Sequence, residues 1–381
     1  MLSKSNQHRR NVKNEFTEKF SILFFIMAST MKKPHVIVHP SNMTQSDWVR
    51  CILPFMQFMY PNPYQVAPSI SHILASSKDT LLKTRAVILQ KPSAAGRMEA
   101  ASMYAGLKRE CNFKLITDFD DLMWDLSPII QSYAQGIPNH DQIVKDRLKQ
   151  VLPLFDSVVC STRYLANRVK EDLGVHAIVM PNGVSKSLFG SHKTTAAFTG
   201  KPKVMYAGAL GHTTDKILGD FEGPWVPWIK KSIEDGSIDF LTFGTPDFLK
   251  GLEGKYTSIP YTSVMQFPGV AASYRPDFYL APLASNNFNR AKSDLKLKEA
   301  AALGAVFIGS DFENSPYGYA PKEQLVTESD TPESLADKFN ALCKPENFMS
   351  AIEWQYNMIE KEHWYIEDPV FQRNFAFTYF G

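Results

Sequence analysis

The sequence predicts an α/β protein with two successive parallel β-sheets. Short apolar segments alternate with helical patterns along the chain, and such alternation is typical of parallel strands joined by right-handed crossover helices. The length of 381 residues is sufficient for two domains of ordinary size. A polar segment of small residues at 191–200 divides the series and predicts an interdomain linker.

Each series supplies five strand candidates. In the first we expect strands at Val36–His39, Ala86–Gln90, Phe113–Asp118, Ser157–Cys160 and Ala177–Met180, with helices at Gly96–Cys111, Asp141–Leu154 and Arg163–Leu173. In the second we expect strands at Val204–Ala207, Asp239–Phe243, Asp277–Ala281, Ala305–Ile308 and Gln324–Val326. The chain therefore divides into an extension at 1–31, a first domain at 32–190, a second at 201–350 and a C-terminal helical segment at 351–381.

The first 31 residues resemble a secretion signal only superficially. Basic residues precede an apolar run at 20–27, but Glu15 and Glu18 interrupt the basic region, and Met31 offers a natural start for the first domain. We favour a loosely attached extension or an amphipathic helix. No apolar run approaches the roughly 20 residues needed to span a bilayer.

The cysteines and the charge distribution indicate the cellular compartment and the kind of partner to expect. The four cysteines are widely separated, which argues against a disulfide framework or a zinc site and favours the reducing cytoplasm. Residues 1–200 hold 24 Lys and Arg against 15 Asp and Glu, whereas the remainder holds 17 against 24. A basic half attracts a polyanion or an anionic membrane surface. The alternative is a chance bias between two solvated surfaces.

The segment 286–310 carries the strongest functional signal. Ser293 is a suitable N-cap for a helix over Leu295–Leu303, Gly304 ends that helix, and a buried strand follows. A helix N-terminus presents unpaired amides that bind phosphate. Nearby side chains add positive charge and a carboxylate that can accept bonds from ribose hydroxyls, namely Asn289, Arg290, Lys292, Lys296 and Glu299. The alternative is an ordinary amphipathic helix with a Lys–Glu surface pair.

The run Asn289-Arg290-Ala291-Lys292-Ser293, followed by Lys296 and Glu299, resembles the donor-binding segment of glycosyltransferases with the two-Rossmann GT-B fold, especially the family 4-like branch. The resemblance implies two Rossmann-like domains facing across a cleft and a nucleotide-diphosphate sugar as donor. It also implies that Glu299 binds the ribose and that the anomeric configuration is retained. Many members carry a second glutamate, which contacts the sugar, where this chain has Ala291. The passage Pro181-Asn182-Gly183-Val184 is similar to the end of the first domain in that branch, and we assign it a structural turn.

An acidic loop follows the third strand of the first series. Asp118, Asp120 and Asp121 are candidates for orienting an acceptor hydroxyl, stabilising positive charge on the sugar or acting as general base. The sequence Asp-Asp-Leu-Met-Trp at 120–124 is similar to the acidic loop of the same branch. One alternative is the metal-binding Asp-x-Asp of the other glycosyltransferase fold, and another is a structural N-cap cluster. The two-unit organisation disfavours the metal site.

Two further candidate loops each follow the first predicted strand of a domain. Gly208 and Gly211 allow close approach of a ligand, and His212 and Lys216 are candidate phosphate contacts, because the loop resembles the Gly-Ser-x-x-His loop of related transferases. In the first domain, His39 and Ser41 would face the sugar or the acceptor. His39 could equally be a structural histidine.

These observations predict a glycosyltransferase that needs no metal cofactor and transfers a sugar to a hydroxyl acceptor. The basic first half favours an anionic acceptor, specifically hydroxymethylated pyrimidines of phage DNA in the host cytoplasm. A bacterial surface-glycan or glycolipid transferase in peripheral contact with a membrane is the main rival. The sequence also leaves open a non-catalytic nucleotide-sugar or nucleic-acid binding module and a sugar-nucleotide epimerase.

Overall fold

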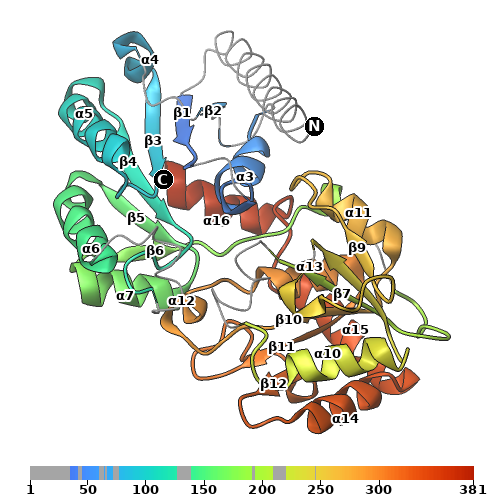
Figure 1. Cartoon of the computed structure of the whole chain (residues 1–381). Helices are drawn as coiled ribbons and strands as arrows, with labels where there is room; N and C mark the ends of the chain where they lie inside the picture. The colour runs from blue at the N-terminus through green and yellow to red at the C-terminus, as the bar shows by residue number, and fades with distance from the viewer. Residues whose placement is uncertain are drawn as a thin grey trace, which may run out of the picture.

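Two six-stranded parallel sheets form the framework of the protein (Figure 1). The computed structural model describes residues 35–41, 45–59, 64, 67–71, 77–126, 139–190, 194–208, 220–244 and 246–381. The predicted extension and three of the predicted site residues, Gly211, His212 and Lys216, lie outside the described residues. The expected fold class, an α/β protein with two Rossmann-like sheets, is confirmed.

The first sheet has the strand order β2-β1-β3-β4-β5-β6. Its strands are β1 (His35–His39), β2 (Ala67–Ile70), β3 (Thr84–Gln90), β4 (Lys114–Phe119), β5 (Ser157–Cys160) and β6 (Ala177–Val179). Its helices are α2 (Gln45–Asp47), the π-helix η1 (Trp48–Ile52), α3 (Leu53–Met56), α4 (Lys78–Leu82), α5 (Ala95–Cys111), α6 (His140–Val151), the 3₁₀ turn η3 (Leu152–Leu154) and α7 (Arg163–Leu173). The order reverses direction between β1 and β3, which is where parallel sheets bind ligands.

The second sheet has the order β9-β8-β7-β10-β11-β12, the arrangement of dinucleotide-binding folds. Its strands are β7 (Lys203–Ala207), β8 (Asp239–Phe243), β9 (Thr257–Ile259), β10 (Phe278–Ala281), β11 (Val306–Asp311) and β12 (Leu325–Thr327). Its helices are α8 (Lys186–Phe189), α10 (Trp225–Glu234), α11 (Phe267–Tyr274), α12 (Asn287–Arg290), α13 (Leu295–Leu303) and α14 (Pro332–Leu342), with 3₁₀ turns η4 (Asp247–Leu249) and η5 (Lys322–Gln324). Here the reversal lies between β7 and β10.

The sequence predicted ten of these strands, and most of their observed ends lie within about two residues of the predicted ends. The strands β2 and β9 were not predicted. Both are short edge strands, and β2 contains Pro68, which sequence reasoning takes as evidence against a strand. Helix α13 spans the predicted residues and ends at Gly304 in the left-handed conformation. The N-cap is Asp294, not Ser293 as predicted. The Asp294 carboxylate contacts Lys298 at 2.9 Å instead of the backbone of the helix.

The chain ends in two helices, α15 (Pro345–Lys361) and α16 (Pro369–Phe380). Helix α16, red in Figure 1, lies against the first sheet, where Phe371, Phe375 and Tyr379 join the same buried cluster as Val36 and Phe55. Within the residues that the structure describes, the chain passes between the two sheets twice, and the two crossing segments pair at Val184 and Tyr365. The backbone of Gly183 is packed there so closely that a Cβ would lie 2.7 Å from Ile366, so only glycine fits.

Candidate active site

The N-terminal region of α13 lies between the two sheets and touches both domains. Ala291 is fully buried in the cluster of apolar residues of the first domain, and its carbonyl accepts a hydrogen bond from the Thr162 hydroxyl at 3.0 Å. Ser293 accepts from the side chain of Asn182 at 2.9 Å. The loop that carries the predicted donor residues therefore forms part of the domain interface.

Lys296 and Glu299 lie at the carboxyl edge of the second sheet, beside the reversal in strand order. The Lys296 ammonium donates to the carbonyl of Ala207, the last residue of β7, and lies 5.2 Å from the ring centre of Tyr206. Burial lowers the pKa of Lys296 to about 8, although Glu299 opposes that shift. The site thus holds a cation that remains largely protonated at pH 7.

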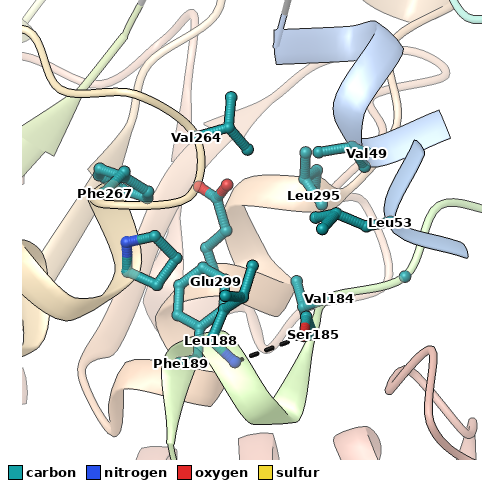
Figure 2. Close-up of a pocket in the computed structure, with 12 residues that line it drawn as sticks. Val49, Leu53, Val184, Ser185, Leu188, Phe189, Val264, Phe267, Leu295 and Glu299 are labelled. Carbon is teal, nitrogen blue, oxygen red and sulfur yellow. Dashed lines mark hydrogen bonds between the residues drawn. The ribbon is translucent and has the colours of Figure 1, made fainter. Parts of the chain in front are cut away.

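Glu299 is nearly buried and faces a narrow apolar cleft between the domains. Its Oε2 accepts a hydrogen bond from the Tyr279 hydroxyl at 2.8 Å, and burial raises the pKa of the carboxyl. Figure 2 shows the carboxylate pointing into this cleft, with Val49 and Leu53 of the first domain on one side and Phe267 of the second on the other. Glu299 is thus the carboxylate among the mostly apolar residues that line this cleft.

Asp120 and Asp121 of the first domain meet this region from the other side. The Asp120 carboxylate accepts from Asn182 at 3.0 Å, and burial together with the neighbouring Asp121 raises its pKa to about 6. Asp121 lies between two lysines, 3.8 Å from Lys91 of the first domain and 3.9 Å from Lys292 of the second. The side chains of both lysines and of Asp121 are each about one-fifth exposed.

Asp118 does not share this environment. It is fully buried, and both of its carboxylate oxygens receive hydrogen bonds from the Arg50 guanidinium at 2.9–3.1 Å. The Tyr379 hydroxyl of α16 donates to the same carboxylate. A general base must reach the proton that it removes, and Asp118 cannot do so from this position. The catalytic assignment of Asp118 is therefore replaced by a structural one: it joins β4 to η1 and α16.

His39 is also structural. It is 1% exposed, its Nδ1 donates to the Ser71 carbonyl at 2.8 Å, and its Nε2 accepts from the Tyr104 hydroxyl at 2.8 Å. Burial lowers the pKa of His39 to about 4, so the ring is neutral. The predicted contact of His39 with sugar or acceptor is not possible in this arrangement. Ser41 is partly exposed at the same strand end, where its hydroxyl donates to Asp47 at 2.7 Å.

The neutral state of buried His39 leads to a prediction about how the stability of the protein depends on pH. Its pKa in the unfolded chain is about 6.5, so below that pH the unfolded chain binds a proton that the folded protein excludes. The free energy of unfolding should therefore fall as the pH drops from about 6.5 to about 4. Urea unfolding at pH 7.5 and pH 5 should show a larger loss for the natural chain than for the His39→Asn variant. An equal loss in both proteins would contradict the buried, neutral histidine.

Two residues predicted to bind the nucleotide sugar, Asn289 and Arg290, instead bond to neighbouring loops. Asn289 is fully buried and donates to Asp220 at 2.7 Å and to the Ala284 carbonyl at 2.9 Å, so it cannot touch a donor directly. Arg290 donates to the Glu313 carbonyl and to the Ser285 hydroxyl at 2.9 and 3.0 Å. These contacts hold the loops after β10 and β11 rather than an open phosphate site.

Sequence reasoning missed several contributors to the interface and its supports, among them Arg50, Lys91, Asn182 and Lys298. Lys298 is 2% exposed and donates to the Asn182 carbonyl at 2.7 Å, so α13 is attached to the first crossing segment. Lys91 has a left-handed backbone (φ 49°), which is uncommon for a residue with a side chain, at the end of β3. A charged residue directly after a buried strand was the available signal for Lys91. Gly208, which follows β7, is packed against its neighbour Tyr206.

The overall structure is similar to several solved proteins. A glycosyltransferase from Rickettsia africae aligns over 91% of this chain and 97% of its own, with 12% identity and a TM-score of 0.57. Sucrose-phosphate synthase from Thermosynechococcus elongatus aligns over 91% and 98%, with 10% identity and a TM-score of 0.57. Anabaena HepE, crystallised with UDP, aligns over 91% and 99%, with 11% identity and a TM-score of 0.55.

No protein-family model matches the chain, and no curated protein matches it by sequence. Among the helices in the described ranges, none is long and apolar enough to cross a membrane. The assignment of the fold depends on the two parallel sheets, on their strand orders and on the similarity to these solved structures. The chain has the two-domain GT-B fold of glycosyltransferases.

Proposed function

We propose that this protein is a glycosyltransferase that moves a sugar from a nucleoside diphosphate to a hydroxyl acceptor. The observation that carries the proposal is the ion pair of Lys292 with Asp121 across the domain interface, on the segment that also carries Lys296 and Glu299. Lys296 and Glu299 lie at the carboxyl edge of the second sheet, where folds with this strand order bind nucleotides. The UDP in the HepE crystals supports a nucleoside diphosphate as the ligand class.

The arrangement suggests a role for each group. Glu299 would accept hydrogen bonds from the ribose hydroxyls. Lys292 and Lys296 would neutralise the diphosphate as the bond between the anomeric carbon and the phosphate oxygen breaks. These cations would take the place of a metal ion, so we propose a metal-independent reaction.

We further propose that the anomeric configuration is retained. The acceptor oxygen would then attack from the face that the diphosphate leaves, and the acceptor proton would pass to a phosphate oxygen of the leaving group. Asp120 and Asp121 would stabilise the positive charge that develops on the sugar. If the product is instead inverted, Asp120 is the available base, because Asp118 is enclosed.

For the acceptor we propose an anionic polymer, with hydroxymethylated pyrimidines of DNA as the specific candidate. The support is the surplus of basic residues in the first 200 positions. A cytoplasmic location fits both the nucleotide donor and the four free cysteines.

The test is sugar transfer from a panel of labelled nucleotide sugars, each with and without EDTA. Acceptors would be duplex DNA with hydroxymethylcytosine, the same DNA without it, and vesicles that contain glycolipid. Label on the modified DNA in EDTA, with DNA binding that weakens steeply as salt rises, is the expected result. Label on the glycolipid would overturn the DNA acceptor, and interconversion of free nucleotide sugars would indicate an epimerase. Donor binding without transfer or hydrolysis would indicate a binding module.

A further inference from the structure

The side chain of Asn182 connects the two domains at the candidate active site. It is 3% exposed, and its amide nitrogen donates to Asp120 Oδ1 at 3.0 Å and to Ser293 Oγ at 2.9 Å. Its amide oxygen accepts from the Arg50 guanidinium at 3.2 Å. All of the donors and one acceptor position of this amide are therefore in use.

The chemistry of these partners fixes the orientation of the amide. A guanidinium can only donate, so the atom that faces Arg50 must be the oxygen. An ionised carboxylate can only accept, so the atom that faces Asp120 must be the nitrogen. The ion pair with Asp118 holds Arg50 at 2.9 Å and gives the amide oxygen a fixed partner. The direction of the Asn182 side chain is thus set by the Arg50 guanidinium, which can never accept a hydrogen bond.

The backbone on both sides of this contact is also fixed. The Lys298 ammonium holds the carbonyl of Asn182 at 2.7 Å, and the Ser161 hydroxyl donates to the backbone carbonyl of Asp120 at 3.2 Å. Asp120 is partly exposed, and its Oδ1 accepts the hydrogen bond from Asn182. The carboxylate is therefore anchored through one of its two oxygens.

We propose that Asn182 is a positioning residue that orients the Asp120 carboxylate and links it to Ser293 on the loop before α13. The mechanistic meaning of this role rests on the proposed function, whereas the link itself does not. In the glycosyl transfer reaction, the link would align Asp120 only when Ser293, and with it the donor segment, is in contact with the first domain. Asn182 would then couple donor-site geometry to the carboxylate that faces the reacting sugar.

The first experiment measures Asp120 directly. Aspartate labelled with ¹³C at the carboxyl carbon would be titrated by NMR in the full chain, and the Asp120→Asn variant would identify the signal. A hydrogen bond to a carboxylate favours its ionised form, so Asn182→Ala should raise the pKa of Asp120 by about one unit. Ser293→Ala, which leaves the contact with Arg50 intact, should raise it less, and Ser293→Thr should restore it.

Controls separate this role from a general effect on folding. Ser315→Ala removes a hydroxyl of the second domain that bonds only within that domain, to the Ser310 carbonyl and the Tyr317 amide, and it should leave the Asp120 titration unchanged. If Asn182→Ala fails to fold, Ser293→Ala decides the matter alone. A pKa of Asp120 that is the same in the Ser293→Ala protein as in the natural chain would overturn the proposed link.

The second experiment uses activity. The acid limb of the pH profile of kcat/KM, which reports groups of the free enzyme, should move upward in Asn182→Ala by the same shift as the NMR titration, while KM for the donor stays within about twofold. A merely structural role would lower the melting temperature without moving that limb, and this result would overturn the proposal. If the natural chain transfers no sugar at all, the proposed function fails, but the NMR titration still decides the role of Asn182.

Discussion

Replacing Glu299 with alanine is expected to weaken binding of the nucleotide sugar by about 10- to 100-fold, the loss typical of hydrogen bonds to a charged group. Glu299 presents a carboxylate to the cleft, and the only hydrogen bond described for it is donated by Tyr279. Glu299→Gln keeps an acceptor oxygen and should lose less affinity. Isothermal titration with the preferred donor would measure both variants.

A matched control for this experiment is Glu353→Ala, which removes an exposed carboxylate on α15. It should bind the donor like the natural chain. The Glu299→Ala protein should be titrated well below its melting temperature, because the buried Tyr279 hydroxyl loses its partner. An unchanged donor affinity in Glu299→Ala would remove Glu299 from the binding site.

Replacing Asp118 with alanine should lower the free energy of unfolding by about 3–5 kcal/mol, because it leaves the buried Arg50 cation without its counter-ion. Urea unfolding would measure the loss. The double change of Arg50→Met with Asp118→Leu removes both charges and should recover much of the stability. Asp120→Ala, at a partly exposed position two residues away, should cost far less. A loss of under about 1 kcal/mol in Asp118→Ala would contradict the structural role assigned to this ion pair.

The contrast between Asp118 and Asp120 shows where sequence reasoning ends. Both belong to one acidic run, and nothing local distinguishes them. The distinction comes from Arg50, which approaches from 68 residues earlier in the chain, and from Tyr379, which arrives 261 residues later. Local patterns predict strands and helices well because apolar periodicity is local, but the partner of a buried charge is set by tertiary packing.

The segment 286–310, which carries the predicted donor-binding residues, shows the same limit of sequence-based prediction. The sequence identified α13, its end at Gly304 and the proximity of Lys296 to Glu299, since these features follow from helix geometry. It did not predict that Asn289 would be buried or that Ala291 would pack into the other domain. The sequence analysis assigned Asn182 to a structural turn, whereas the side chain of Asn182 forms hydrogen bonds with three residues from distant segments.

The most direct test of the central claim is a thermal-shift screen of the full chain against nucleoside diphosphates and their sugar derivatives, with and without EDTA. We predict that one nucleotide family raises the melting temperature in the presence of EDTA, and that Glu299→Ala reduces that shift while Glu353→Ala does not. No shift with any nucleotide, or an equal shift in the Glu299→Ala protein, would contradict a donor site at the carboxyl edge of the second sheet.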